Sequence, residues 1–287
     1  MGRTRGSPAS PAPVGQPSVA VGIPDWRAGR DAGVPPTFVV AGAKGGVGKS
    51  VIAILLARSL AEYGQRALLV DGEQNLGMLH VLLNVRLQTQ LDAVVREEVD
   101  PEDLLVRVAS RLWLLPSALG TEELYGLGVL DRARLHFKLT RAFAAFDVVI
   151  VDVGSELESV VRVASLGATR LILVTTAEPG ALAGARALVG IVHLQVPALP
   201  IDVLVNRTDT PREAESTFAA LRDRVGRGLT PSLHFLGGMP TDPDLRHAVW
   251  SGDGLTERIG ECEAVRTARA VVSQSLLPAA LSHESEG

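Results

Sequence analysis

Short apolar runs alternate along the chain with longer segments in which apolar residues recur at helical spacing. The runs are rich in Val, Leu and Ile, which is typical of parallel strands buried on both faces of a sheet. They predict strands at 37–40, 66–71, 111–116, 147–152, 171–175, 201–206 and 232–236. Helices are predicted at 50–63, 76–83, 91–107, 131–145, 181–193, 211–224, 243–250 and 262–277. This alternation predicts an α/β fold, with a single doubly wound, mostly parallel sheet and helices on both faces.

The two ends of the chain differ in composition from the segment between them. Residues 1–36 hold many Pro, Gly and Ser residues and few large apolar side chains, so we predict a disordered tail there. Residues 278–287 begin with a proline and end in an acidic stretch, which predicts a short acidic tail. The predicted folded domain therefore spans residues 37–277.

Composition narrows the class of protein. With 28 basic and 32 acidic residues the net charge is −4, so there is no bulk attraction to DNA or to anionic lipid. The single cysteine, Cys262, cannot form an internal disulfide, which favours a reducing compartment. The sequence contains no apolar run of about 18 residues and no apolar signal core near its start. These features predict a cytoplasmic protein.

Residues 43–50 read Ala-Lys-Gly-Gly-Val-Gly-Lys-Ser and lie directly between the first predicted strand and the first predicted helix. Glycines allow the backbone amides of this loop to turn inward around phosphate oxygens, and the helix N-terminus adds positive potential. Lys49 should reach the β- and γ-phosphates, and the Ser50 hydroxyl should bind Mg²⁺. A glycine-rich turn without a ligand is the alternative, which the flanking elements and both lysines disfavour. The predicted nucleotide contacts are Lys44, Gly45, Gly46, Val47, Gly48, Lys49, Ser50 and Val51.

Two predicted strands end in acidic residues. Asp71 closes the second strand and is followed by Gly72 and Glu73, and Asp152 closes the most hydrophobic strand. In phosphate-loop proteins such carboxylates face Mg²⁺ and the attacking water, so we predict that Asp71 and Asp152 join Ser50 at the metal. A solvated strand-end acid or a helix cap is the alternative for Asp152. The histidines show no metal-ligand spacing, which leaves Mg²⁺ with ATP as the only predicted cofactor.

Lys44 is a second lysine, at the start of the loop, and gives the loop the deviant Walker A pattern. On this motif, and on the order of the segments from about Val39 to about Trp250, the chain resembles the MinD/ParA-type ATPases. The resemblance implies binding of ATP and ADP, and an ATP-dependent homodimer in which Lys44 reaches the ATP of the second subunit. A solvated lysine at the edge of the loop is the alternative.

The same resemblance implies catalytic roles for Lys44, Lys49 and Glu73. Both lysines would stabilise charge on the transferred phosphoryl group, and Glu73 would orient the hydrolytic water. Members of the family usually carry Asp at the position of Glu73. Because a misplacement of roughly 1 Å can cost about a hundredfold in rate, this longer carboxylate is compatible with slow hydrolysis. A nonhydrolytic role for Glu73 is the alternative.

Two later segments resemble the base-binding elements of the family. Asn206 and Arg207 end a predicted strand, where the family places an asparagine that reads the adenine edge. Pro240 and Asp242 lie in a segment that resembles the loop closing over base and ribose. Asparagine at the end of a strand is often only a turn residue, which remains the alternative for Asn206.

Several stretches resemble the FlhG/FleN regulators of flagellar number, most specifically residues 239–249. That branch usually carries an N-terminal Asp-Gln-Ala-x-x-Leu-Arg motif for its partner, and residues 1–36 contain nothing like it, so the protein partner stays unknown. We predict an ATP-dependent dimerisation switch in spatial or numerical regulation, of flagella in the first instance. The alternatives are a nucleotide-sensing scaffold with little hydrolysis and a ParA-like partitioner that carries cargo on DNA, which the net charge does not support.

The last predicted helix, residues 262–277, places Val265, Ala268, Val272 and Leu276 on one stripe. A membrane-targeting helix would show more basic residues and some Trp or Phe. We therefore predict that this helix packs on the sheet and that membrane contact is not stable.

Overall fold

The computed structural model describes residues 35–73, 77–87, 94, 98–116, 138, 141–165, 167–226, 231–252, 254–255, 259–277 and 280. Both predicted tails lie almost entirely outside the described residues, as does most of the predicted helix at 131–145.

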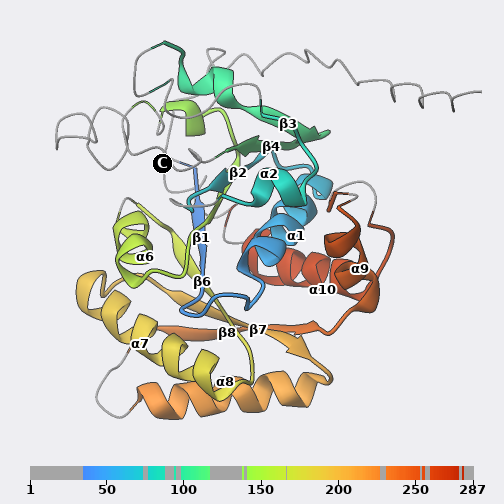
Figure 1. Cartoon of the computed structure of the whole chain (residues 1–287). Helices are drawn as coiled ribbons and strands as arrows, with labels where there is room; N and C mark the ends of the chain where they lie inside the picture. The colour runs from blue at the N-terminus through green and yellow to red at the C-terminus, as the bar shows by residue number, and fades with distance from the viewer. Residues whose placement is uncertain are drawn as a thin grey trace, which may run out of the picture.

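The described strands form one eight-stranded sheet in the order β3-β4-β2-β5-β1-β6-β7-β8 (Figure 1). Every neighbouring pair is parallel except β3 and β4, which are antiparallel. This arrangement confirms the predicted mostly parallel sheet. The strands are β1 Thr37–Ala41, β2 Ala67–Asp71, β3 Val106–Ala109, β4 Leu112–Leu115, β5 Val148–Asp152, β6 Arg170–Thr175, β7 Ile201–Thr208 and β8 Leu233–Pro240.

Helices cover both faces of the sheet because successive strand residues point to opposite sides. In β1, Phe38 and Val40 enter the core that packs against α1 and α10, whereas Val39 and Ala41 enter the core shared with α6, α7 and α8. Figure 1 shows α1 beside α10 on one side of the sheet. The helices are α1 Lys49–Glu62, α2 Leu79–Leu82, α6 Leu157–Ala164, α7 Pro179–Gln195, α8 Pro211–Val225, α9 Pro243–Ser251 and α10 Glu263–Val271.

The predicted last helix packs on the sheet as expected. Its stripe residues Val265, Ala268, Val272 and Leu276 are all buried in the core with α1, and α10 continues as a π-helical turn, Val272–Leu276. Among the described residues, no helix is both long enough and apolar enough to cross a bilayer.

The prediction of one helix over 91–107 is wrong for the C-terminal part of that range. A 3-10 helix, η1, spans Pro101–Leu104, and β3 follows at Val106–Ala109. Asp100 is extended, as the residue before a proline usually is, and it forms a reciprocal capping box with Asp103. The residues of β3 then pair with those of β4, the next strand along the chain, and helical periodicity gives no sign of this pairing.

Several other elements differ from the predictions. The chain forms α6, which was not predicted, and α2 is shorter than the predicted range 76–83. Strand β8 continues four residues past the predicted end at 236, because its C-terminal half remains paired with β7 up to Pro240.

The order of the strands creates the site. Strand β1 lies between β5 and β6, where the chain switches from building one half of the sheet to building the other. Ligands of open α/β sheets bind at such switch points, beyond the carboxyl ends of the strands. The loop of residues 42–48 leaves β1 at this point.

Candidate nucleotide-binding site

The loop after β1 has the backbone of a phosphate cradle. Gly46 and Gly48 adopt positive φ values of 77° and 96°, which glycine accepts without strain. Gly48 is the N-cap of α1, so Lys49 and Ser50 occupy its first turn. The free amides of a helix N-terminus and its dipole favour an anion at this position. The predicted strand-loop-helix is therefore confirmed as a structural unit.

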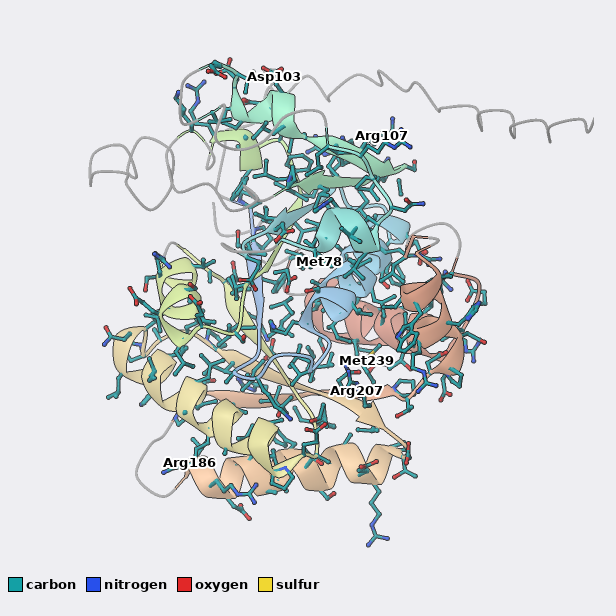
Figure 2. All side chains as sticks on the ribbon, in the orientation of Figure 1. Met78, Asp103, Arg107, Arg186, Arg207 and Met239 are labelled. Atoms are coloured by element: carbon teal, nitrogen blue, oxygen red, sulfur yellow. The ribbon has the colours of Figure 1, made fainter. Side chains whose placement is uncertain are left out.

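Asn206 and Arg207 fasten the loop from the end of β7. The Asn206 Nδ2 donates to the Val47 carbonyl at 2.7 Å, and the Arg207 Nη2 donates to the Gly46 carbonyl at 2.7 Å. Both bonds use loop carbonyls and leave the loop amides available for phosphate oxygens. Arg207, beside Met239 of β8 in Figure 2, holds an unusual φ of 59°. Adenine recognition by these residues stays a prediction.

Ser50, Asp71, Glu73 and Asp152 come together at the ends of β2 and β5. Asp71 and Asp152 are direct partners in the register of these strands, and both side chains are buried. The Ser50 hydroxyl donates to the Asp152 carboxylate. The pKa of Asp152 is raised to about 7, and burial is the largest cause. The Ser50 hydrogen bond and the charge of Lys49 lower this pKa, whereas the charges of Asp71 and Glu73 raise it.

Asp152 fits the chemistry of a magnesium ligand. Its Oδ1 is buried and has no hydrogen-bond partner among the described residues. A buried oxygen without a donor is costly, and a bound cation or its water shell would satisfy it. The described residues contain no cluster of three or more His, Cys, Asp or Glu side chains arranged around a metal. Mg²⁺ usually keeps several waters and takes further oxygens from phosphates, so it does not require such a cluster.

Both carboxylate oxygens of Asp71 accept hydrogen bonds from the backbone, unlike Oδ1 of Asp152. The Asp71 Oδ2 accepts from the Leu79 amide at 3.2 Å and its Oδ1 from the Glu73 amide at 3.3 Å. The pKa of Asp71 is nevertheless raised to about 6, because the effects of burial and of the Glu73 charge outweigh those of the two amides. The carboxylate thus links β2 to the start of α2, and its role at the metal stays a prediction.

Lys44 lies at the rim of the loop and forms an ion pair with Glu178, at the N-cap of α7. The side chains are 45% and 54% exposed, so the pair faces solvent. The bond and charge of Lys44 lower the pKa of Glu178, and Arg207 adds a smaller effect. Glu178 was not predicted as part of the site, because it is 134 residues away from Lys44 in the sequence. Its position between the end of β6 and the first turn of α7 could have suggested it.

The Asp242 carboxylate caps two helices. It accepts from Asp244 and Leu245 in the first turn of α9, at 2.9 and 3.0 Å, and from Ala264 in α10 at 2.9 Å. Burial alone would raise the pKa of Asp242, but these amides and the Cys262 thiol bring it below its usual value. Pro240 ends β8, opposite Thr208 in β7. Contacts of Pro240 and Asp242 with nucleotide remain predictions.

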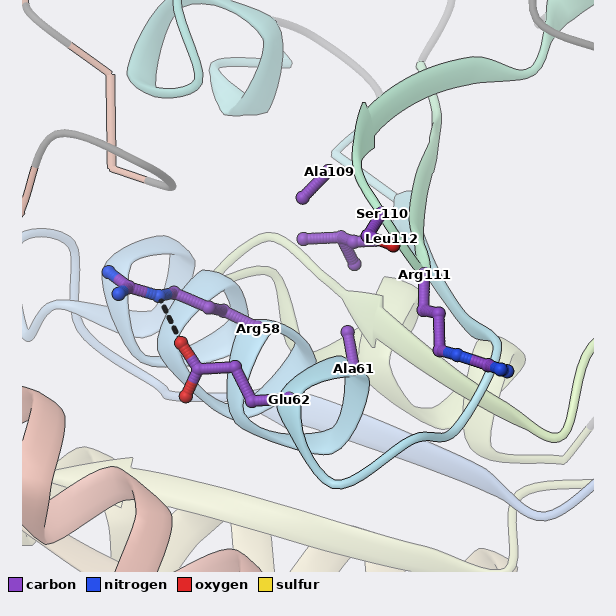
Figure 3. Close-up of a pocket in the computed structure, with 7 residues that line it drawn as sticks. All are labelled: Arg58, Ala61, Glu62, Ala109, Ser110, Arg111 and Leu112. Carbon is purple, nitrogen blue, oxygen red and sulfur yellow. Dashed lines mark hydrogen bonds and ion pairs between the residues drawn. The ribbon is translucent and has the colours of Figure 1, made fainter.

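A separate pocket of roughly 200 Å³ lies far from the phosphate loop, between the C-terminal half of α1 and the turn joining β3 to β4 (Figure 3). The Arg58–Glu62 ion pair lies on one side of it and Arg111 on the other. The lining residues are Arg58, Ala61, Glu62, Ala109, Ser110, Arg111 and Leu112. Because α1 starts at the loop and ends at this pocket, the pocket is not part of the nucleotide site.

Comparison with known proteins defines the class. The model of the AAA domain family matches residues 36–198, and the chain belongs to that family. A MinD from Pyrococcus horikoshii, solved in complex with Mg-ADP, shares the fold with a TM-score of 0.64 and 23% identity, covering 85% of this chain and 97% of that one. The chain is thus a P-loop protein of the MinD/ParA fold.

Two relatives narrow the placement within this class. The antiactivator FleN of Pseudomonas aeruginosa is 28% identical over 241 residues, covering 83% of this chain and 85% of FleN. The flagellum site-determining protein YlxH of Helicobacter pylori is 23% identical over 213 residues, covering 74% and 72% of the two chains. The chain is a MinD/ParA-type ATPase related to FleN, as its motifs predicted.

Proposed function

We propose that this ATPase is an ATP-dependent dimerisation switch that regulates the number or the site of flagella. The flagellar part is supported by the likeness to FleN and to the flagellum site-determining YlxH. The switch is supported above all by Lys44, which lies at the rim of the phosphate loop with its side chain 45% exposed and thus accessible to a second subunit.

The loop supplies the nucleotide contacts. The amides from Gly45 to Lys49 would surround the phosphates, and the Lys49 ammonium would contact the β- and γ-oxygens. Ser50 and Asp152 would hold Mg²⁺, a role that fits the partnerless buried oxygen of Asp152. Bound Mg²⁺ would neutralise charge that develops on the phosphate oxygens.

Dimerisation would require Lys44 to exchange partners. In the structure its ammonium is paired with Glu178, but an exposed ion pair of this kind contributes little, so it opposes the exchange only weakly. In the ATP-bound dimer Lys44 would contact the nucleotide of the second subunit. Glu73 would then orient the attacking water, and Lys44 and Lys49 would stabilise the transferred phosphoryl until hydrolysis separates the subunits.

ATP-dependent dimerisation of purified variants tests the switch. Light scattering should show a dimer with Mg-ATP for the wild-type chain and for the control Arg212→Ala, whose side chain is exposed on α8. Lys44→Ala should remain monomeric while it still binds ADP. A dimer of unchanged stability in Lys44→Ala would refute the role of Lys44 in the second subunit's site. Cells that lack the gene should carry an altered number of flagella, and an unchanged number would contradict the flagellar output.

A second candidate function is a nucleotide-sensing scaffold that binds ATP but hardly hydrolyses it. The presence of Glu73, in place of the Asp usual in the family, favours it. In that case Glu73→Asp should raise ATP turnover at least about tenfold, by restoring the distance to the water. No gain in turnover would count against the scaffold.

A further inference from the structure

Gly154 provides the space that the Glu73 carboxylate occupies. A Cβ atom added to Gly154 would lie 2.6 Å from Oε2, 2.7 Å from Oε1 and 2.9 Å from Cδ of Glu73. Its three nearest neighbours would thus all belong to that carboxylate group. The φ of Gly154 does not lie in the left-handed region, so its backbone does not itself require glycine. A side chain at residue 154 would instead occupy the space that the Glu73 carboxylate fills.

The backbone around this contact leaves little freedom to adjust. The Gly72 amide donates to the Asp152 carbonyl at 2.7 Å, and a Cβ on Gly72 would lie 2.9 Å from that same oxygen. The ends of β2 and β5 are therefore held together directly before Glu73 and Gly154. If residue 154 gained a methyl group, the end of the flexible Glu73 side chain would move, and the two strands would stay in place.

The Glu73 carboxylate lies close to Asp71 and Asp152, the predicted Mg²⁺ ligands. The negative charge of Glu73 raises the pKa of both Asp71 and Asp152, which places it within electrostatic reach of both. Glutamate is one methylene longer than the aspartate usual in the family. Because the Glu73 carboxylate lies against Gly154, which has no side chain, the longer Glu73 side chain fits beside these aspartates instead of extending into solvent.

We propose that Gly154 is a positioning residue that fixes the Glu73 carboxylate where it orients the hydrolytic water. This inference rests on the proposed role of Glu73 in hydrolysis. In that reaction the water oxygen forms a bond to the γ-phosphorus, and the bond from that phosphorus to the bridging oxygen of ADP breaks. The products are ADP, inorganic phosphate and a proton. A carboxylate displaced by roughly 1 Å would lower the rate by up to about a hundredfold.

A double-mutant cycle between residues 73 and 154 tests the proposal, with single-turnover hydrolysis of radiolabelled ATP to resolve slow rates. Gly154→Ala should lower the rate constant at least about tenfold in the wild-type background. In the Glu73→Asp background the shorter side chain leaves room for the methyl group, so the same substitution should change the rate less than about twofold. Gly260→Ala, where a Cβ would meet nothing within 4 Å, is the matched control.

Three readouts besides hydrolysis separate positioning from damage to the fold. Gly154→Ala should bind ADP within about twofold of wild type and unfold at nearly the same temperature, and its ATP-bound dimer should persist longer because hydrolysis is slower. An equal loss of rate in both backgrounds, or no loss in the wild-type background, would overturn the role of Gly154. If Glu73→Gln also hydrolyses ATP at the wild-type rate, the proposed function of Glu73 itself has failed. If Glu73→Gln is slow and Gly154→Ala is normal, only the inference about Gly154 has failed.

Discussion

At the scale of single residues, the glycines of the phosphate loop are not equivalent. A Cβ at Gly48 would lie 2.3 Å from the Asn206 amide nitrogen, at a residue with φ of 96°, whereas a Cβ at Gly45 would meet nothing within 4 Å. The first position needs glycine both for its conformation and for the close approach of Asn206. The second needs it for neither reason.

Gly48→Ala should therefore disrupt the loop, and Gly45→Ala should largely preserve it. Strain at a left-handed position costs on the order of 1–3 kcal/mol, and displacement of Asn206 would also release the Val47 carbonyl. We expect at least about a tenfold loss of ADP affinity for Gly48→Ala by fluorescence titration, since about 1.4 kcal/mol corresponds to tenfold. Equal losses for the two variants would contradict this distinction between them.

The buried carboxylates predict how nucleotide binding depends on pH. Burial raises the pKa of Asp152 to about 7 and that of Asp71 to about 6 in the metal-free protein. Below these values both groups are protonated, and if they hold Mg²⁺ as predicted, its binding must displace those protons. The gain in ADP affinity from Mg²⁺ should thus be largest near pH 8 and decline as the pH falls through 7 and 6.

Titrations with Mg²⁺ and with a chelator, repeated across this pH range, would measure that gain. Asp152→Asn removes the group that titrates near pH 7, so it should show a smaller gain that hardly changes between pH 8 and 7. A wild-type gain independent of pH would contradict the assignment of Asp152 to the metal.

Residues that belong to one local motif were predictable, and residues that meet across the fold were not. Lys49 and Ser50 follow a glycine loop between a strand and a helix, and the backbone itself dictates their positions. The pairing of Lys44 with Glu178 depends on β1 and β6 being neighbours, and the contact of Glu73 with Gly154 depends on β2 and β5 being neighbours. Chain spacing carries no information about either.

At the scale of elements, the Asp242 side chain accepts hydrogen bonds from two helices, α9 and α10, whose contact is not predictable from the sequence. It caps α9 within its own segment, and it also accepts from the buried Ala264 amide of α10. An aspartate before a proline predicts the first role from local sequence. The second role depends on the loop between the helices bringing α10 back to β8.

Asp242→Ala should destabilise the fold by about 2–3 kcal/mol, since it removes a helix cap and leaves a buried amide without an acceptor. Urea unfolding would measure the loss, with the exposed Asp244→Ala as control at no more than about 1 kcal/mol. Because the pKa of Asp242 is lowered in the fold, its contribution is present above the usual pKa and is lost as the pH falls through the folded value. Wild-type stability in Asp242→Ala would refute the double cap.

Helices and strands whose own sequence carries a clear apolar pattern were predictable, and those that depend on pairing with another element were not. Parallel strands such as β5 are continuous apolar runs, and their burial on both faces makes them visible in the sequence. Strand β3 was mistaken for helix because it is short, partly exposed and stabilised by antiparallel pairing with β4. The contact of Arg107 over the Trp113 ring, at 5.7 Å, adds to that pairing and could not be anticipated from spacing.

At the scale of the whole molecule, the nucleotide site connects the two halves of the sheet. The loop from β1 is fastened by Asn206 and Arg207 of β7 on one side, and it faces the carboxylates of β2 and β5 on the other. A ligand held by residues from both halves binds the folded chain and not the unfolded one. Its binding energy therefore adds to global stability.

Mg-ADP should for this reason raise the unfolding temperature of the whole domain. At a ligand concentration about 100 times Kd the added stability is about 2.7 kcal/mol, and each kcal/mol shifts the midpoint of a domain of this size by roughly 2–4 °C. We expect a shift of roughly 5–10 °C in calorimetry, reduced by a chelator and nearly absent in Lys49→Ala. With Mg-ATP the shift should also grow with protein concentration, because dimer formation removes further monomer from the unfolding equilibrium, whereas with Mg-ADP it should not. If the unfolding temperature in Mg-ATP does not depend on protein concentration, the ATP-bound protein is a monomer. That result would contradict the proposed dimerisation switch.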